Sequence, residues 1–155
     1  MEEKYIVWHI EGGLGKNIAA TSLLSSLKEK HPERKIVVVA SYPEIFLNLP
    51  SVYRVYRLGS TQYFYDDYIK NKDTIVFKHE PYYETQHILK NKHLIANWCK
   101  ILDIEYTFQS PVLNFNLIHQ LNATKWNREK PILLIQTNGG MLNSDLGYSW
   151  TRDIP

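Results

Sequence analysis

Residues 5–40 read YIVWHIEGGLGKNIAATSLLSSLKEKHPERKIVVVA. The segment opens with a short apolar run at 5–8, passes through a glycine cluster at 12–15 and continues with apolar residues at helical spacing. It closes on a β-branched run at 35–40, which is typical of a strand covered on both faces in a parallel sheet. The segment therefore predicts a strand, a glycine loop, a helix and a second, parallel strand.

The helix predicted after the glycine loop has a clear apolar face. That face comprises Ile18, Leu23, Leu24 and Leu27. We expect Asn17 to cap its first turn, and we expect the helix to end near His31.

Strands and helical segments alternate along the rest of the chain. Further strands are predicted at 52–56, 73–77 and 131–136, a short helical turn at 42–50, and one helix over 87–102. We therefore predict an α/β fold, in which a Rossmann-like parallel sheet is flanked by helices. A polar stretch at 122–130 predicts a domain boundary.

The composition excludes several classes of protein. With 155 residues, 44% hydrophobic and 22% charged, the chain should fold as an ordinary soluble domain. A net charge of +2 is too small for a nucleic-acid-binding protein. The single cysteine, Cys99, excludes an intrachain disulfide and a thiolate metal cluster, and no apolar stretch at the N-terminus suits a signal peptide or a membrane span. We expect a cytoplasmic protein.

The glycine loop is the first candidate site. Gly12, Gly13 and Gly15 lie where a strand is expected to meet a helix, so backbone amides and the positive end of the helix dipole could hold a phosphate, a carboxylate or a sugar hydroxyl. The alternative is that the glycines only permit a tight turn and close packing of the helix.

Two nucleotide-binding motifs fit this loop poorly. Residues 11–17 are similar to the deviant phosphate-binding loop of partitioning ATPases, but the ATPase motif needs glycine where Ile10 stands and a hydroxyl where Asn17 stands. The dinucleotide fingerprint needs a third glycine at Ile18 and an acidic residue after the second strand, which ends at Ala40. A nicotinamide cofactor is therefore not expected.

Residues 12–24 resemble the N-terminal motif of the heptosyltransferase-like glycosyltransferases. In that motif a glycine and any residue precede Leu-Gly-Asp, and a helix with Thr-Pro-Leu-Leu follows; here Ser22 stands in place of the proline. The resemblance continues at residues 27–28, 31–32, 35–40, 48–56, 93–106, 111–113, 131–136 and 150–155.

This resemblance implies a GT-B architecture of two Rossmann-like domains that face a cleft. Residues 1–125 would be the acceptor-side domain, and residues 126–155 would be the linker with the first strand and loop of a truncated donor-side domain. The implied reaction transfers a heptose-like sugar from a nucleotide-diphosphate donor to a lipopolysaccharide-type or other surface glycan. It implies no cofactor beyond the nucleotide-sugar co-substrate and no metal, and it allows contact with the inner face of a membrane.

The catalytic residues implied by the resemblance differ from the family pattern at one position. The family has an aspartate, credited as the base, where this chain has Lys16. Lys16 would then bind an acidic acceptor group or the donor diphosphate. The role of base stays open among Glu11, Asp66, Asp67, His79 and Glu80. His79 and Glu80 follow a predicted parallel strand at its carboxyl end, where open α/β sheets bind ligands.

Further residues are expected to bind substrate. Asn17 would join Gly12, Gly13 and Gly15 around the acceptor, and Tyr82 could stack on a sugar. The resemblance places Thr137, Asn138 and Arg152 near the diphosphate of the donor.

Two other functions stay open from the sequence alone. The first is a non-catalytic α/β module that binds a carbohydrate or a partner protein, which the lysine at position 16 favours. The second is a P-loop-like nucleotide-binding protein, which would bind ATP with magnesium.

Overall fold

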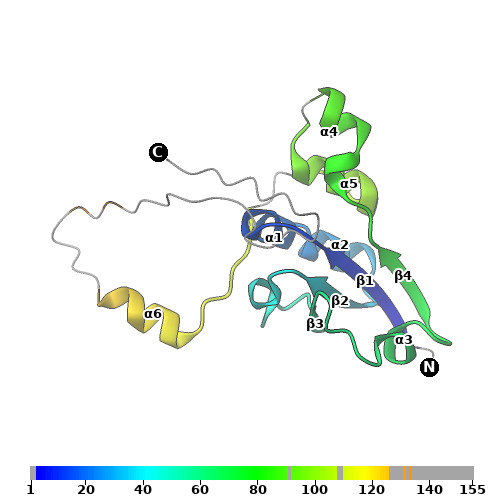
Figure 1. Ribbon diagram of the computed structural model, residues 1–155, viewed down its shortest axis with the longest axis horizontal. Coiled ribbons are helices and arrows are strands. Elements are labelled where there is room, and N and C mark those ends of the chain that lie inside the picture. The colour runs from blue at the N-terminus through cyan, green and yellow to red at the C-terminus, as the bar shows by residue number, and fades with distance from the viewer. Residues whose placement is uncertain (1–2, 91, 108–109, 126–130, 132, 134–155) are drawn as a thin grey trace. The chain divides into compact units, whose positions relative to one another are not determined.

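The computed structural model describes residues 3–90, 92–107, 110–125, 131 and 133. The chain divides into two compact units, Met1–Asn114 and Phe115–Pro155. The first unit contains a sheet of four parallel strands in the order β3-β2-β1-β4 (Figure 1). The predicted α/β fold with a Rossmann-like parallel sheet is confirmed.

The strands lie close to where the sequence predicts them. Their bounds are Lys4–Ile10 for β1, Lys35–Ala40 for β2, Arg54–Arg57 for β3 and Asp73–Phe77 for β4. Trp8 of β1 pairs with Val38 of β2 on one side and with Phe77 of β4 on the other. The carboxyl ends of β1 and β4 therefore lie next to each other.

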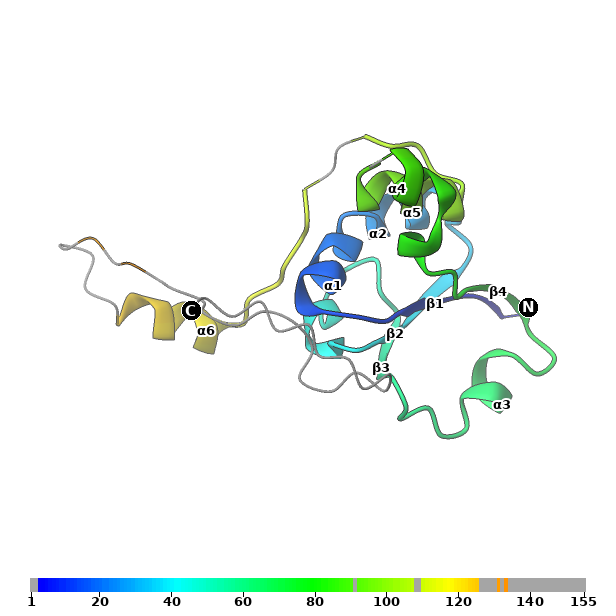
Figure 2. The same cartoon turned by 45° about the horizontal axis from the view of Figure 1, so that its top comes forward.

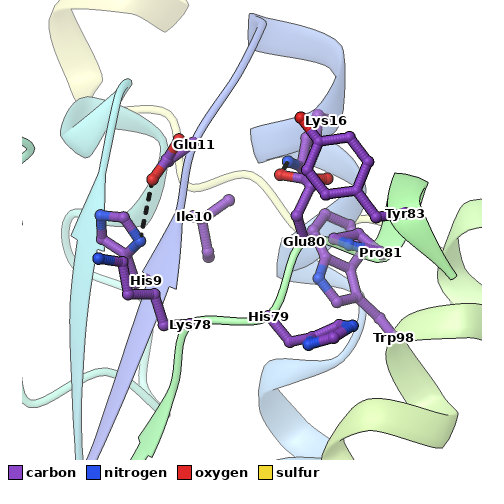
Figure 3. Close-up of a pocket in the computed structure, with 10 residues that line it drawn as sticks. All are labelled: His9, Ile10, Glu11, Lys16, Lys78, His79, Glu80, Pro81, Tyr83 and Trp98. Carbon is purple, nitrogen blue, oxygen red and sulfur yellow. Dashed lines mark hydrogen bonds and ion pairs between the residues drawn. The ribbon is translucent and has the colours of Figure 1, made fainter.

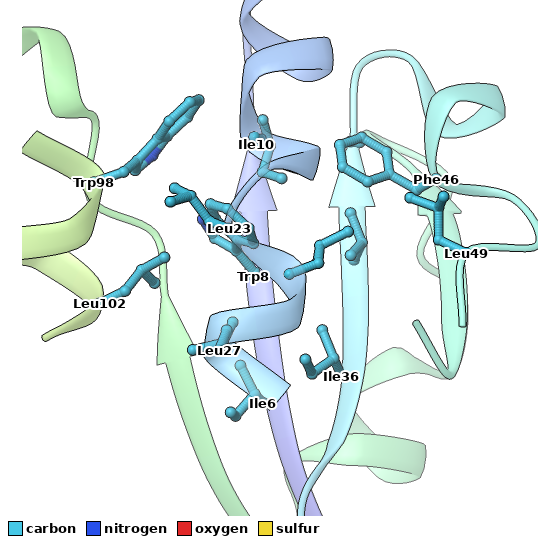
Figure 4. Packing of buried hydrophobic residues seen from close by; sticks show 14 of the residues in the cluster. Ile6, Trp8, Ile10, Leu23, Leu27, Ile36, Phe46, Leu49, Trp98 and Leu102 are labelled. Atoms are coloured by element: carbon cyan, nitrogen blue, oxygen red, sulfur yellow. The ribbon is translucent and has the colours of Figure 1, made fainter. Parts of the chain in front are cut away.

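Side chains alternate between the two faces of the sheet and build two cores. Ile6, Trp8 and Ile10 face a large cluster shared with α1 (Leu14–Thr21), α2 (Leu24–Lys30) and α5 (Leu94–Leu102). Figure 4 shows this packing, with Leu23 and Leu27 over the strands and Trp98 beside them. The Trp8 and Trp98 rings meet edge to face at 5.7 Å between centroids. This cluster fixes α1 and α5 against β1.

The opposite face of the sheet has a smaller core. Tyr5, Val7 and Val39 pack there with Tyr68 of α3 (Phe64–Tyr68). Figure 2 shows α3 on one side of the sheet and α1, α2 and α5 on the other. Short 3-10 turns, η1 (Pro43–Phe46) and η2 (Pro81–Tyr83), complete the connections, and η1 confirms the helical turn predicted at 42–50.

The helix expected after the glycine loop is broken into two. α1 ends at Thr21 and α2 begins at Leu24, because the hydroxyls of Thr21 and Ser22 bond back to the carbonyls of Ile18 and Ala19. The prediction that Asn17 caps the helix is wrong, since Gly13 occupies that position and Asn17 lies inside α1. The expected end near His31 is confirmed.

The single helix predicted over 87–102 is also wrong. The chain forms α4 (Thr85–Lys90) and α5, and His93 begins α5 by accepting a hydrogen bond from the Ile95 amide through its ring nitrogen. Extended backbone at His93 separates the two helices. Ile88, an apolar residue near the start of that predicted helix, is 61% exposed.

The second unit contains α6 (Leu117–Thr124), whose first turn is capped by the Asn116 side chain. The division after Asn114 comes before the boundary expected at 125. Of the strand predicted at 131–136, only Pro131 and Leu133 are described, so this prediction falls largely outside the described residues. Among the described helices, none has the length and apolar character needed to cross a bilayer.

Arg34 ties the beginnings of three strands together. It precedes β2, and its guanidinium donates to the backbone carbonyls of Tyr5 (3.3 Å) and Asp73 (2.9 Å) and, through Nη2, to both carboxylate oxygens of Asp73 (2.9 Å each). The Arg34 side chain is only 11% exposed. The neighbouring guanidinium holds the pKa of the Asp73 carboxyl below its ordinary value.

We expect Asp73→Asn to destabilise the fold in a pH-dependent way. Because the folded-state pKa of Asp73 is lowered, its contribution is complete above the ordinary aspartate pKa of about 4 and is lost as pH falls through the lower folded value. Urea unfolding should show a gap in midpoint between wild type and variant at pH 7 that narrows towards pH 3. Asp66→Asn, at an exposed carboxylate of α3, is the control and should change the midpoint little. A gap that stays constant with pH would contradict this role for the Asp73 charge.

Candidate functional site

A pocket of about 170 Å³ opens at the carboxyl ends of β1 and β4. It is lined by His9, Ile10 and Glu11 from the end of β1, by Lys16 from α1, and by residues 78–81, Tyr83 and Trp98 (Figure 3). Parallel α/β sheets commonly bind ligands at this edge. The pocket is smaller than the ~300–1,000 Å³ cavities that enclose whole ligands, so it suits one part of a ligand, such as a single sugar ring.

A salt bridge between Lys16 and Glu80 lies at the centre of one wall. The Lys16 ammonium donates to the Glu80 carboxylate, and the two side chains are 5% and 24% exposed. The other Glu80 oxygen accepts a hydrogen bond from the Tyr82 amide at 3.3 Å, which begins η2. The salt bridge therefore joins α1 to the segment that leaves β4.

Aromatic rings surround the Lys16 ammonium. Its nitrogen lies 5.2 Å from the centre of the Tyr82 ring and 5.9 Å from that of Trp98. Both distances are within the range of cation–π attraction. Tyr83 lines the pocket and is 74% exposed, so its ring is free to meet a ligand at the mouth.

The glycine loop shapes the same wall of the pocket. Gly12 has a φ of +97°, and a Cβ atom there would lie 3.1 Å from Cδ of Lys16. Gly13 and Gly15 face open space. Within the described part of the chain, the backbone amides of Leu14 and Gly15 donate to no acceptor. The first turn of α1 therefore offers free hydrogen-bond donors.

The Asn17 side chain has a structural role in the glycine loop. Its side chain is fully buried, and its amide nitrogen donates to the carbonyls of Gly12 (3.2 Å) and Gly13 (2.9 Å). The amide oxygen has no hydrogen-bond partner in the described structure. Asn17 thus holds the loop closed over the helix start and has no exposed surface with which to touch a substrate.

His9 is a site residue that the sequence analysis missed. Its Nδ1 lies 3.4 Å from Oε1 of Glu11, and both residues line the pocket. Burial is the main cause that lowers the pKa of His9, the Glu11 carboxylate opposes this, and the Lys78 and Lys16 charges add to the lowering. The imidazole is therefore neutral at pH 7 and able to accept a proton. Its position three residues before Gly12, the first glycine of the loop, was the signal available in the sequence.

His79 is already engaged at the rim of the pocket. Its Nε2 lies 2.7 Å from Oε1 of Glu84, and the other Glu84 oxygen lies 3.3 Å from the Lys100 ammonium. The His79 side chain is 57% exposed. This arrangement anchors η2 to α5 and makes His79 a weaker candidate for the base than His9.

The structure brings together only part of the predicted site. Lys16, Glu11, His79 and Glu80 all line the pocket. Asp66 and Asp67 do not, because they lie on α3 beside a separate depression lined by Glu3 and Tyr5, at the start of β1. The expected substrate ligands Thr137, Asn138 and Arg152 lie outside the described residues. The described residues contain no group of three or more His, Cys, Asp or Glu side chains that could hold a metal ion.

Comparisons of the chain with protein-family models, with curated proteins and with solved structures find no match. The geometry of the site and the residues that form it are therefore the grounds for a functional proposal.

Gly12→Ala should destabilise the protein by about 1–2 kcal/mol, because alanine resists a positive φ. The new methyl group would also press on the Lys16 side chain. Gly15→Ala makes the same chemical change inside α1, where nothing obstructs a Cβ, and should stabilise the protein by about 0.5–1 kcal/mol. Chemical denaturation of both variants measures the difference.

A third variant separates the cost of the positive φ from the cost of the contact with Lys16. Gly59→Ala meets a positive φ of +82° with no atom within 4 Å, so it should cost less than Gly12→Ala. Equal costs at the two positions would show that the contact with Lys16 has no energetic consequence.

Proposed function

We propose that this chain contains the acceptor-binding domain of a glycosyltransferase of the heptosyltransferase-like type. The observation that carries the proposal is the combination of the Lys16–Glu80 salt bridge, the neutral His9 and the exposed Tyr83 ring around one small pocket. Charged groups bind sugar hydroxyls, and aromatic rings pack on the apolar faces of sugars. The acceptor is a surface glycan of the lipopolysaccharide type, and the single, buried Cys99 accords with a cytoplasmic protein.

His9 is the proton acceptor in this mechanism. Nδ1 of His9 is the ring nitrogen nearer to Glu11, at 3.4 Å from Oε1, so in the tautomer with the proton on Nδ1 the Nε2 lone pair is left to receive the proton of the acceptor hydroxyl. The alkoxide oxygen then forms a bond to the anomeric carbon of the donor sugar, and the bond from that carbon to the diphosphate breaks. Glu11 orients the imidazole and stabilises the imidazolium that forms.

Lys16 and Glu80 bind the acceptor. Because Glu80 balances the charge of Lys16, the pair presents both a cation and carboxylate oxygens to the pocket. An ammonium donates hydrogen bonds and a carboxylate accepts them, so together they suit a pair of neighbouring hydroxyls. This role explains how a lysine can stand where the family has an aspartate, with the carboxylate supplied from the end of β4.

A glycan array probed with the purified chain tests acceptor binding. We expect the wild-type chain to retain a small set of glycans, and Lys16→Met and Glu80→Gln to reduce the retention about tenfold or more, as the loss of one charged hydrogen bond implies. Asp66→Asn, away from the pocket, is the control and should bind like wild type. Failure of the wild-type chain to bind any glycan, or unchanged binding by both pocket variants, would refute the proposal.

A glycan that the wild-type chain binds on the array is then used to separate glycan binding from sugar transfer. In a chain that includes the donor-side domain, His9→Gln should keep glycan binding and lose most sugar transfer from a panel of nucleotide-sugar donors. Binding without transfer by the wild-type protein would instead assign the chain to the non-catalytic carbohydrate-binding class.

A further inference from the structure

A second cavity lies at the opposite edge of the sheet from the pocket. It is an open depression of about 310 Å³ near the beginnings of β1, β3 and β4, and α3 contributes part of its wall. Figure 1 shows α3 near the beginning of β1, whereas α1 follows the end of that strand. Every described residue that lines the depression is either charged or a tyrosine. Its volume falls within the ~300–1,000 Å³ of cavities that hold whole small ligands.

Tyrosines give the depression a fixed wall and hold Arg54 in place. Tyr5 and Tyr68 line it and are each only 3% exposed, and their rings meet edge to face at 5.1 Å between centroids. The Arg54 guanidinium lies 5.9 Å from the centre of the Tyr53 ring. Hydrogen bonding to the Tyr56 hydroxyl is the main cause that raises the pKa of Arg54, and Tyr68 adds to it. Arg54 is therefore a positioned cation.

Several other charges around the depression are balanced within the protein. Glu3 accepts hydrogen bonds from Lys35 at 2.9 Å and from Lys72 at 3.0 Å, and these contacts lower its pKa to about 2. One Asp66 oxygen lies 3.4 Å from the Lys70 ammonium. These five groups form local salt bridges, so none of them needs a ligand to balance its charge.

Arg54 and Asp67 have no such balance, although both line the depression. Neither forms a salt bridge with the other or with any other described residue. An anion alone would be attracted to Arg54 and repelled by Asp67, and a cation alone would meet the reverse. A ligand that carries both charges would be attracted to both side chains.

We propose that this depression binds a free α-amino acid. The Arg54 guanidinium binds the carboxylate, because its planar fork of donors matches the two carboxylate oxygens. The Asp67 carboxylate accepts hydrogen bonds from the ammonium. An α-amino acid carries its two ionic groups on one carbon atom, so a single small ligand meets both side chains.

The amino-acid site goes beyond the proposed function. The depression lies at the amino ends of the strands and the pocket lies at their carboxyl ends, and no described residue lines both. Neither proposal depends on the other, so the failure of one leaves the other standing.

Isothermal titration calorimetry with each of the standard amino acids tests the proposal. The purified chain should bind a subset of them. For the amino acid that binds most tightly, the analogue without the amino group and the analogue without the carboxyl group should each bind about tenfold more weakly or worse, because each lacks one charged contact. Asp67→Asn and Arg54→Gln should each lower the affinity for the amino acid by about tenfold or more.

The Asp67→Asn variant gives the sharpest result. It should bind the amino acid and the analogue without the amino group about equally, since the partner of the ammonium is gone. Because Asp67 is exposed, this variant should unfold at the wild-type denaturant midpoint.

Three control variants carry changes outside the depression. Arg57→Gln and Glu44→Gln neutralise an exposed pair of opposite charges that does not line the depression, and both should bind the amino acid like wild type. Tyr83→Ser alters the mouth of the pocket and should also keep amino-acid binding.

Three results would overturn the proposal. The first is that no amino acid binds the wild-type chain. The second is that either analogue binds as tightly as the amino acid itself. The third is that binding is lost in Tyr83→Ser and unchanged in Asp67→Asn, which would place the ligand in the pocket.

Discussion

The salt bridge between Lys16 and Glu80 is the interaction on which the site depends. It joins the first turn of α1 to the segment leaving β4, and almost all of the Lys16 side chain is removed from water. A buried ammonium without a partner is strongly unfavourable, so Glu80 must be present for Lys16 to lie there. Gly12 is a further requirement, since any larger residue would meet the lysine stem. The glycine loop, Lys16 and Glu80 therefore depend on one another and form one structural unit of the site.

In our proposal this unit explains how the pocket could bind a sugar with a lysine at position 16. In our proposal the carboxylate comes from β4, the next strand of the sheet, and the base comes from His9 at the end of β1. Both strands end at the same edge, so the pieces meet although they are distant in sequence.

The sheet was predictable from sequence because its strands are encoded locally. The runs at Lys35–Ala40 and Asp73–Phe77 are apolar and rich in β-branched residues, and the structure has strands with those bounds. The breaks in the two predicted helices were missed, because the helical spacing of apolar residues continues through both of them. Hydroxyls that bond back to helix carbonyls break the first helix, and the cap at His93 breaks the second. The pairing of Glu80 with Lys16 and the burial of His9 depend on which strand ends meet. Neither feature can be predicted from the spacing of residues that are close in sequence.

A double-mutant cycle on Lys16→Met and Glu80→Gln, measured by chemical denaturation, tests the central claim most directly. The two side chains touch, so each single variant should destabilise the protein, and the double variant should lose less than the sum. We predict a coupling energy above about 1 kcal/mol. Additivity of the two changes within about 0.5 kcal/mol would contradict the claim that this salt bridge holds the loop and β4 together as one site.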